Sequence, residues 1–556
     1  MGLYLLDYGA GNVQSLANTL AKLGHTFTWI SSPDDFDKAT SLIFPGVGAF
    51  QTAIDHLNAR GLLEPLRAYI ASGRPYFGIC IGMQVLFQSS LEAGASVKGL
   101  GVVPQAIGRF DNADKAVPHM GWNALNLLDE HQPAEGITPG SHFYFVHSFR
   151  AAYEPEANPE AACFTHSVTQ YGQEVFVASV RKGNVFGCQF HPEKSGAAGL
   201  RMLAAWLAEP EFARANALPN VRGSYTPRAT HGFTRRIVAC MDVRANDQGD
   251  LVVTKGDQYD VREKAPTSSL QTNAAGAVRN LGKPVALAAR YYAAGADELA
   301  LLNITSFRHS PLRDQPMLSV VRAAAETVYV PLTIGGGIKD TVDPDGTPQP
   351  ALEVAGAYFR AGADKVSIGS EAVYAVERLR GKGMGDGTSA IEQIARVYGR
   401  QAVVVSVDPK RVYVGLDYDG PRMEEIVRGE GADDGKAWWY QCTVAGGREA
   451  RDVSVLELAR GIEVLGAGEI LLNSIDRDGT GAGFDLALVK LVKNAVRIPV
   501  VASSGAGKPQ HFVDVFQKTG VEAALAAGIF HREEVKIEDV KRAMVDAGLN
   551  TRVDIG

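Results

Sequence analysis

The chain has 556 residues, more than one hydrophobic core usually serves, so we expect at least two domains. Its formal net charge is −7 and no long run of one sign occurs, which argues against nucleic acid as the main partner. Five cysteines occur without a CxxC pair, so we expect reduced thiols in the cytoplasm, with neither a disulfide framework nor a metal site. No stretch approaches the roughly 20 apolar residues that cross a bilayer, so we expect no membrane partner.

The N-terminal part alternates short apolar runs with segments that carry apolar residues at helical spacing. Such alternation predicts an α/β domain with a largely parallel, flavodoxin-like sheet covered by helices on both faces. Residues 217–236 are rich in Pro, Gly, Ser and Thr, so we place this domain at 1–210 and a linker at 211–234. The predicted strands are residues 3–9, 41–48, 76–80, 143–148 and 185–192.

The remaining segment, 235–556, contains eight apolar runs with helical patterns between them, the number of strands in a (β/α)8 barrel. Because this segment is longer than such barrels usually are, we expect the excess in polar loops. The predicted strands are residues 236–243, 298–304, 330–337, 364–370, 402–408, 469–476, 498–505 and 523–528, and the predicted loops are 260–280, 340–352 and 421–437.

The barrel segment also repeats itself. GADELALLN, from Gly295, is similar to GAGEILLN, from Gly466, and PLTIGGGI, from Pro331, is similar to PVVASSGAG, from Pro499. The offset is roughly 170 residues in these pairs, which predicts two four-strand halves related by a near two-fold axis.

A candidate nucleophile, Cys80, lies in the sequence FGICIGMQ, a G-x-C-x-G turn between a predicted strand and a predicted helix. This is the cysteine form of a nucleophile elbow, in which small flanking residues permit a sharp turn that exposes the sulfur. The N-terminus of the following helix would favour the thiolate. Alone, the motif also fits a buried packing thiol.

The sequence HPE, after another predicted strand, supplies the groups that a cysteine nucleophile needs. His191 can take the thiol proton and return one to the leaving group, and Glu193 can orient the imidazole. The loop PGVGAF, with Gly46 and Gly48, can offer backbone N–H groups to an oxyanion, as can the amide of Ile81, although PGVG also fits a plain turn.

These motifs, together with PHMGWN (118–123), YFVHSF (144–149) and HPEKS, resemble the class I glutamine amidotransferases of histidine biosynthesis. The resemblance implies that Cys80, His191 and Glu193 form a triad that cuts ammonia from glutamine. It also implies that a few residues hold the glutamine: Gln84, His147, Ser148 and Phe149.

In the barrel, Asp242 ends the first strand and Asp408 the fifth, at equivalent positions of the repeat. Two carboxylates facing each other across one pocket suit general acid/base catalysis, although each alone also fits a structural aspartate. Glycine-rich strand ends occur in pairs in both halves, which predicts two phosphate sites for one long substrate. These are IGGGI (334–338) with SIGS (367–370), and SSGAG (503–507) with LAAGIF (525–530).

Residues 235–530 resemble the cyclase of the same pathway, and the whole chain resembles the fused imidazole glycerol phosphate synthases of fungi and plants. The resemblance implies that the barrel uses the ammonia to convert a bisphosphorylated aminoimidazole ribulosyl substrate to imidazole glycerol phosphate and a ribotide. It further implies that Asp242 and Asp408 are the acid/base pair, that Lys255 assists and that Asp478 contacts substrate. The implied phosphate contacts are Gly337, Gly369, Ser370, Gly505, Ala527 and Gly528.

Two positions depart from the family pattern. Asn303 stands where many bacterial relatives have Asp, so it would bind substrate without an acid role, and Ser504 replaces a more usual Gly. The resemblance also implies a salt-bridge ring that gates the passage of ammonia through the barrel, where ordinary ion pairs are the alternative. The ring residues are Arg236, Glu298, Lys365 and Glu469.

We therefore expect a bifunctional enzyme that acts on glutamine and the bisphosphate, needs no cofactor, and is a monomer because both domains share one chain. Three alternatives remain. The barrel also resembles the sister isomerase of the pathway, whose reaction needs no ammonia. A glutaminase-fed pyridoxal phosphate synthase would need a Schiff-base lysine, for which Lys255 is the candidate. A scaffold of two decayed domains is disfavoured by the five intact catalytic candidates.

Overall fold

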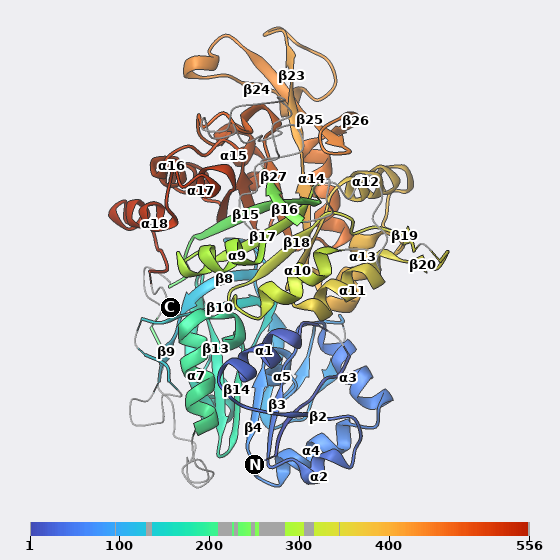
Figure 1. The fold of residues 1–556 in the computed structure, drawn as a ribbon, viewed down its shortest axis with the longest axis vertical. Coiled ribbons are helices and arrows are strands. Elements are labelled where there is room, and N and C mark those ends of the chain that lie inside the picture. The colour runs from blue at the N-terminus through green and yellow to red at the C-terminus, as the bar shows by residue number, and fades with distance from the viewer. Residues whose placement is uncertain are drawn as a thin grey trace, which may run out of the picture. The chain divides into compact units, whose positions relative to one another are not determined.

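The structure is a computed structural model, and it describes residues 2–9, 11–94, 96–128, 136–138, 140–208, 225–226, 232–245, 251–254, 284–304, 316–343 and 345–553. Its internal contacts divide the chain into two compact units (Figure 1). The first unit comprises Met1–Arg235 with two later segments, Ala395–Ala402 and Arg552–Gly556. The second comprises Arg236–Ile394 and Val403–Thr551.

The first unit is built on a mixed sheet in the order β2-β1-β3-β4-β14-β13-β12-β9. The five strands from β2 to β14 run parallel, whereas β13, β12 and β9 continue the sheet antiparallel. The predicted largely parallel sheet is therefore confirmed for five of its eight strands. The strands are β1 (Leu3–Leu5), β2 (Thr28–Trp29), β3 (Ser41–Phe44), β4 (Tyr76–Ile79), β9 (Asn126–Leu127), β12 (Thr165–Tyr171), β13 (Glu174–Lys182) and β14 (Val185–Cys188).

The predicted strand at 143–148 exists, but it does not belong to this sheet. It is β10 (His142–His147), which pairs antiparallel with β8 (His119–Ala124). An apolar run reports burial and not the partner strand, so the sequence could not reveal this pairing. A further small sheet contains β5 (Phe87–Ser90), β6 (Val97–Lys98), β7 (Val103–Arg109) and β11 (Phe149–Arg150).

Helices of the first unit bury one face against these sheets. In α1 (Gln14–Lys22), for example, Leu16 and Leu20 are fully buried at helical spacing and belong to a core with Phe77 and Trp206. The other helices are α2 (Asp35–Lys38), α3 (Phe50–Ala59), α4 (Leu63–Ala71), α5 (Ile81–Gln84), α6 (Pro159–Ala162), η1 (Pro192–Lys194) and α7 (Gly196–Ala208).

The second unit contains the predicted eight-stranded parallel barrel. Its strands follow one another in chain order, and the pairing of the first with the last closes the barrel. Small and branched side chains such as Ala300, Val404 and Val501 fill its interior. The strands are β15 (Arg236–Ala245), β17 (Glu298–Asn303), β18 (Leu332–Gly335), β21 (Lys365–Ile368), β22 (Val403–Val407), β27 (Glu469–Asn473), β28 (Val500–Ser503) and β29 (Ala523–Ala526).

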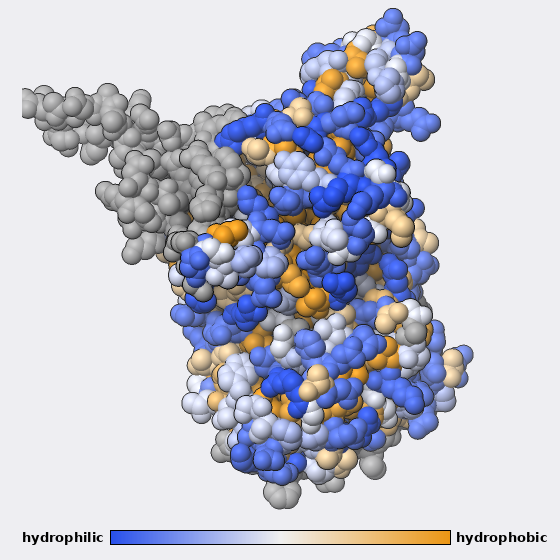
Figure 2. Space-filling model, turned by 90° about the vertical axis from the view of Figure 1, so that its right-hand side faces the viewer, coloured by the Kyte–Doolittle hydropathy of each residue, from blue (hydrophilic) through white to orange (hydrophobic). Residues whose placement is uncertain are grey.

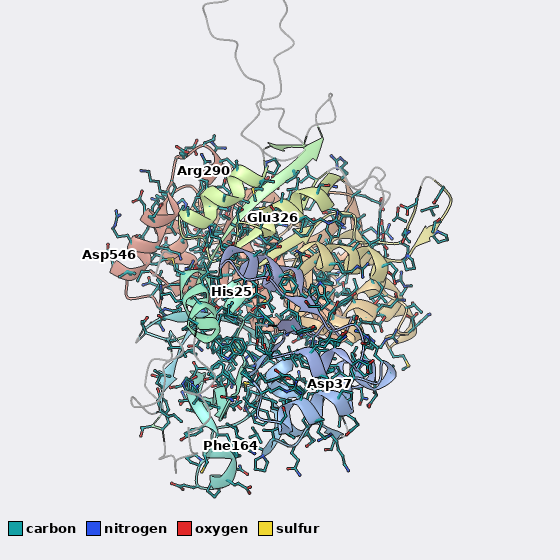
Figure 3. The ribbon with its side chains drawn as sticks, turned by 60° about the horizontal axis from the view of Figure 1, so that its bottom comes forward. His25, Asp37, Phe164, Arg290, Glu326 and Asp546 are labelled. Atoms are coloured by element: carbon teal, nitrogen blue, oxygen red, sulfur yellow. The ribbon has the colours of Figure 1, made fainter. Side chains whose placement is uncertain are left out.

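Amphipathic helices surround this barrel, and Figure 3 shows Arg290 of α9 and Asp546 of α18 on its outer side. Local capping fixes several ends: Ser454 and Glu457 form a capping box on α14, and the left-handed Gly466 ends it. The helices are α9 (Pro284–Ala293), α10 (Pro316–Ala325), α11 (Ala351–Ala361), α12 (Ser370–Lys382), α13 (Ala390–Tyr398), α14 (Val455–Leu465), α15 (Leu486–Ala495), α16 (Pro509–Thr519), α17 (Gly528–His531) and α18 (Ile537–Asp546).

The extra length of the second unit is only partly loop. Residues 421–437, predicted as a polar loop, are mostly turns, and only the two-residue β24 and Ala437 belong to strands. They connect strands of a four-stranded antiparallel sheet of β23 (Pro409–Val414), β24 (Val427–Arg428), β25 (Ala437–Val444) and β26 (Glu449–Ser454). We call residues 409–454 the insert sheet. The predicted loop 340–352 contains a short hairpin of β19 (Thr341–Val342) and β20 (Pro348–Gln349), and 260–280 lies outside the described residues.

One more strand, β16 (Leu251–Thr254), pairs antiparallel with the end of β15. Hydrophilic side chains cover most of the face in Figure 2, with apolar ones in small groups. Among the described residues, no helix is long and apolar enough to cross a membrane.

Candidate active sites

Cys80 lies on a strained turn between β4 and α5. Its φ of 51° and ψ of −102° are unusual for a residue with a side chain, and such strain is typical of nucleophile elbows. Both flanking glycines are required: a Cβ at Gly78 would lie 2.2 Å from the Gly82 carbonyl oxygen, and one at Gly82 would lie 2.0 Å from that of Phe44. Because α5 is a single turn, its dipole adds less than the predicted helix would.

The two predicted partners of Cys80 are buried beside it. His191 Nδ1 lies 2.8 Å from Glu193 Oε1, and His191 and Glu193 are 2% and 4% exposed. Burial by itself lowers the pKa of His191, but the charges of Glu193 and Cys80 outweigh it and raise that pKa well above 6.5. The imidazole is therefore a strong base that is electrostatically coupled to the thiol.

One of the predicted oxyanion donors, the Ile81 N–H, already donates within the chain in this conformation. The Ile81 N–H donates to the Gly46 carbonyl at 3.4 Å, and Gly48 has a φ of 148° that favours glycine. The Tyr8 hydroxyl donates to the Val47 carbonyl at 2.8 Å and holds the loop. The Ile81 N–H must leave Gly46 before it can bind an oxyanion.

The predicted glutamine-binding residues converge near Cys80. Gln84 is 3% exposed, and its Nε2 donates to the Phe149 carbonyl at 3.2 Å and to Gln189 Oε1 at 2.9 Å. His147 Nδ1 lies 2.8 Å from the same Phe149 carbonyl, and Ser148 is buried between them in the chain. Gln189 was not predicted, and its Nε2 donates to Cys80 Sγ at 3.5 Å. The one sequence signal for it is a polar residue in the apolar run VFGCQF.

In the barrel, Asp242 and Asp408 come from opposite sides. Asp242 lies on β15, and Asp408 directly follows β22, the fifth of eight strands. Burial raises the pKa of Asp408, the nearby charge of Asp478 adds to this, and hydrogen bonds from Asn473 and Ser406 oppose it. Cys240 lies beside the other carboxylate, with Sγ 3.9 Å from Asp242 Oδ1.

Two further residues that sequence reasoning missed hold Asp408. The Asn473 Nδ2 donates to Asp408 Oδ1 at 2.7 Å. From the insert sheet, the hydroxyl and the N–H of Thr443 both donate to the Asp408 carbonyl, at 2.7 and 3.2 Å. Two residues further on, the N–H of Ala445 donates to Ser370 Oγ at 3.0 Å. The insert sheet thus contacts both the candidate acid/base residue and a candidate phosphate residue.

The candidate phosphate loops contain positive φ angles, which glycine adopts more readily than other residues. Gly337 and Gly505 have φ values of 79° and 95°, Gly369 is the N-cap of α12, and Ala527 is the N-cap of α17, which begins at Gly528. Ser504 has a φ of 74°, so the serine keeps the left-handed backbone that a glycine would adopt, at a cost in strain of about 1–3 kcal/mol.

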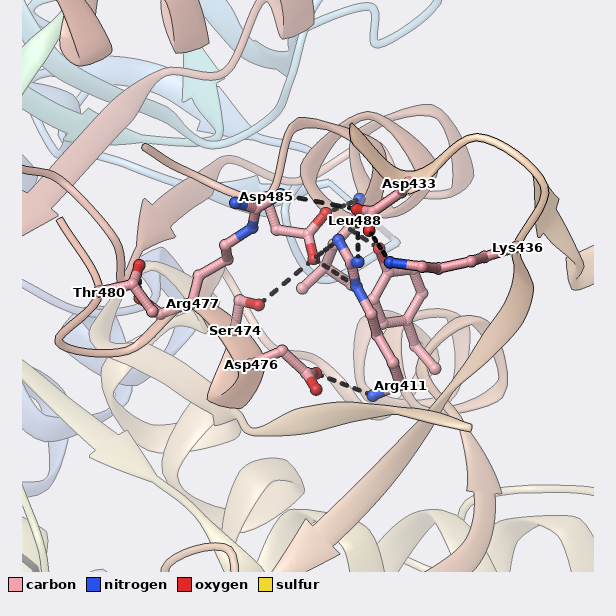
Figure 4. A network of polar contacts seen from close by, with 10 residues as sticks. Arg411, Asp433, Lys436, Ser474, Asp476, Arg477, Thr480, Asp485 and Leu488 are labelled. Carbon is pink, nitrogen blue, oxygen red and sulfur yellow. Dashed lines mark hydrogen bonds and ion pairs between the residues drawn. The ribbon is translucent and has the colours of Figure 1, made fainter. Parts of the chain in front are cut away.

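The insert sheet is tied to the loop after β27 by a network around Arg411 (Figure 4). Its guanidinium donates to Asp485 at 2.9 Å and to Asp433 at 3.0 Å, and its backbone N–H donates to Asp476 at 2.9 Å. Burial alone lowers the pKa of Arg411, but the carboxylates of Asp485 and Asp433 raise it further than burial lowers it. This loop contains η5 (Ile475–Arg477) and the exposed Asp478.

The four predicted ring residues form a closed cycle of buried ion pairs at the starts of strands β15, β17, β21 and β27. Arg236 binds Glu298 at 2.6 Å and also Glu469, and Lys365 Nζ lies 2.6 Å from a carboxylate oxygen of each. Burial would raise the pKa of Glu298, but the charges of Lys365 and Arg236 lower it. Each basic side chain of the ring therefore contacts both carboxylates, and each carboxylate contacts both basic groups.

Comparison with known proteins gives a family for each of the two units. A model of the class-I glutamine amidotransferase family matches residues 4–209, and one described as histidine biosynthesis protein matches 236–536. Proteins named imidazole glycerol phosphate synthase hisHF are similar along nearly the whole chain. The one from Schizosaccharomyces pombe is 53% identical over 97% of both chains, and the one from Emericella nidulans is 50% identical over 99% of this chain and 98% of its own.

The chain belongs to the imidazole glycerol phosphate synthase hisHF family. A chloroplastic member from Arabidopsis thaliana is 51% identical over 99% of this chain and 89% of its own. The chain is thus an enzyme of histidine biosynthesis with a glutamine amidotransferase domain and a cyclase domain, and it acts on small molecules such as glutamine. The predicted family, fold class and bifunctional activity are confirmed. Lys255 lies outside the described residues, and Asn303 ends β17.

We expect Asn473→Leu to move the pH dependence of the cyclase. The lost hydrogen bond stabilises the charged form of Asp408, so its removal raises the pKa of that carboxyl further. The limb of the pH–rate profile that Asp408 contributes should therefore move to higher pH. Rates measured with ammonium salts between pH 5 and 9 test this, and a limb that stays in place or moves to lower pH would contradict it.

We expect Thr443→Val to lower the ammonia-dependent cyclase kcat about three- to tenfold, because one of two hydrogen bonds that hold the Asp408 backbone is lost. Thr443→Ser keeps the hydroxyl and should retain the parent rate. Steady-state kinetics of both variants provide the measurement. The parent rate in Thr443→Val, or a loss in Thr443→Ser as large as that in Thr443→Val, would contradict this role of the hydrogen bond.

Proposed function

We propose that Cys80, His191 and Glu193 carry out the glutaminase step. The thiol proton passes to His191, and the thiolate attacks the carboxamide carbon of glutamine to give a tetrahedral oxyanion. Ammonia leaves with the proton that His191 returns, and water then cleaves the thioester to glutamate. The observation that carries this proposal is the buried His191–Glu193 pair, whose charge raises the pKa of an imidazole coupled to a strained cysteine.

Two groups around the thiol would complete the substrate site. Gln84 Nε2 donates one hydrogen to the Phe149 carbonyl and the other to Gln189 Oε1. Toward the substrate glutamine, Gln84 would therefore act through its oxygen, as a hydrogen-bond acceptor. The segment His147–Phe149 would line the same site. The oxyanion would be bound once the Ile81 N–H is released from the Gly46 carbonyl and the Gly46–Gly48 loop has turned. The resting geometry thus supports a glutaminase of low basal activity.

In the barrel, we propose that Asp242 and Asp408 act as the acid/base pair for addition of ammonia, loss of the ribotide and ring closure. The raised pKa of Asp408 suits a group that exchanges protons near neutral pH. The Ser370 hydroxyl accepts the Ala445 N–H and so keeps its own proton to donate to a phosphate. Lys255, Asn303 and Asp478 would contact the same substrate, with phosphates at Gly337, Gly369, Gly505, Ala527 and Gly528.

We also propose that the ring of Arg236, Glu298, Lys365 and Glu469 gates ammonia passing through the barrel. The ring lies at the strand starts, whereas the acid/base pair lies at the strand ends. We further propose domains at 1–210 and 235–556 with a linker at 211–234, a monomer that needs no partner chain, and a cytoplasmic location.

Cys80→Ser tests the glutaminase proposal. Glutamine-dependent product formation should fall by at least about 10³-fold, whereas the rate with ammonium salts should be unchanged. Cys188→Ala is the matched control, since this second buried cysteine lies in the same core and its thiol donates to the Phe190 carbonyl at 3.2 Å. Product formation by Cys80→Ser from glutamine at the parent rate would refute the role of Cys80.

Lys365→Met tests the gate. It removes one cation of the ring, and we expect glutamate release to persist while product per glutamate falls at least about twofold through ammonia leakage. Lys541→Met is the control, because Lys541 forms an equally buried barrel ion pair with Asp297 at 2.6 Å outside the ring. Equal yields of glutamate and product in Lys365→Met would refute the gate.

A further inference from the structure

A continuous buried hydrogen-bond chain leads to the sulfur of Cys80. It passes from Asn123 through two histidines to the Phe149 carbonyl, and from there through Gln84 and Gln189 to the thiol. The successive links are Asn123 Nδ2 to His119 Nε2 (3.3 Å), His119 Nδ1 to His147 Nε2 (3.2 Å), His147 Nδ1 to Phe149 O (2.8 Å), Gln84 Nε2 to Phe149 O (3.2 Å), Gln84 Nε2 to Gln189 Oε1 (2.9 Å) and Gln189 Nε2 to Cys80 Sγ (3.5 Å).

The direction of every link on the histidine side follows from the groups at its ends. A carbonyl oxygen only accepts, so His147 carries its proton on Nδ1 and accepts at Nε2. His119 must then donate from Nδ1 to His147. Its Nε2 is the acceptor, and the Asn123 side-chain N–H donates to it. Burial lowers the pKa of His147 to about 3, so that ring is neutral. The Phe149 carbonyl is therefore held as an acceptor with a fixed direction.

The same logic fixes the two amides. Gln84 Nε2 has two hydrogens, and both are given away, one to the Phe149 carbonyl and one to Gln189 Oε1. Gln189 therefore has its oxygen toward Gln84 and its N–H toward Cys80. Gln189 is fully buried, so its amide cannot turn without leaving donors or acceptors unpaired.

We propose that Gln189 is a catalytic residue of the glutaminase site, whose amide N–H stabilises the Cys80 thiolate. A hydrogen bond to an anion is stronger than one to a neutral thiol, so this donor favours the reactive form. The inference rests on Cys80 being the nucleophile. It assigns Gln189 a task separate from that of His191, which accepts the proton, and from that of the oxyanion donors.

Several groups besides Gln189 act on the charge of Cys80. Tyr8 lies in the loop after β1, Cys188 ends β14, and His191 with Glu193 follows that strand. Burial and the charge of Cys80 both raise the pKa values of Tyr8 and Cys188, so these groups stay neutral. His191 supplies the positive charge, and Gln189 supplies a neutral donor. A test must therefore change Gln189 alone.

Alkylation of Cys80 by iodoacetamide, followed on the Cys80 peptide by mass spectrometry, reads the thiolate without substrate. In the full-length protein, Gln189→Met should slow alkylation at pH 7 about three- to tenfold, since a less stabilised thiolate is rarer but somewhat more nucleophilic. The loss should be smaller at pH 10 than at pH 7, because a higher pH favours the thiolate in the parent and in the variant alike. Gln189→Glu, which keeps the acceptor for Gln84, should lose at least as much at pH 7.

Gln170→Met is the matched control, because this buried amide in the same unit donates to the Gly172 carbonyl. Its alkylation should stay within about twofold of the parent. A parent rate at pH 7 in both Gln189 variants would overturn the proposal. A loss at pH 10 as large as that at pH 7 would also overturn it, since it would indicate altered packing. Failure of the nucleophile assignment would be distinct, because Cys80→Ser would then still hydrolyse glutamine.

Discussion

Parallel strands bring their carboxyl ends to one edge of a sheet, and both candidate sites depend on this constraint. In the first unit, β4 and β14 pair directly, so the residues that follow them, Cys80 and His191, meet at that edge. In the second unit, closure of the barrel places Asp242 and Asp408 on opposite sides of one mouth. Residues over 100 positions apart thereby become neighbours without any long loop having to fold over the sheet.

Neighbouring polar residues hold the candidate catalytic side chains at these edges by hydrogen bonds. Glu193 fixes His191, Gln189 contacts the sulfur of Cys80, and Asn473 with Thr443 holds Asp408. Buried polar networks of this kind are rigid only when each member is satisfied. The insert sheet contributes to this support. Thr443 on one of its strands donates to the Asp408 carbonyl, and the N–H of Ala445, just after that strand, donates to the Ser370 hydroxyl.

The sequence predicted the elements and motifs whose signal is local. The elbow at Cys80, the HPE motif and the eight barrel strands could be recognised because turn glycines, strand ends and an internal repeat leave a pattern in the chain. The pairing of β10 with β8 could not, since an apolar run does not identify its neighbour. Gln189, Asn473 and Thr443 were missed for a related reason: a polar residue in or after a strand shows its role only through its tertiary partner. The sequence could not show that the Ile81 N–H donates to the Gly46 carbonyl either, because no residue type reveals such a backbone hydrogen bond.

The most direct test of two sites joined by ammonia is the stoichiometry of the full chain. Glutamate release from glutamine would be measured with and without the bisphosphate substrate, while formation of imidazole glycerol phosphate is followed. We expect glutamate release to rise strongly when the bisphosphate is present, with one product formed per glutamate. Glutamate released at the same rate in both conditions, or without cyclised product, would contradict a coupled pair of sites.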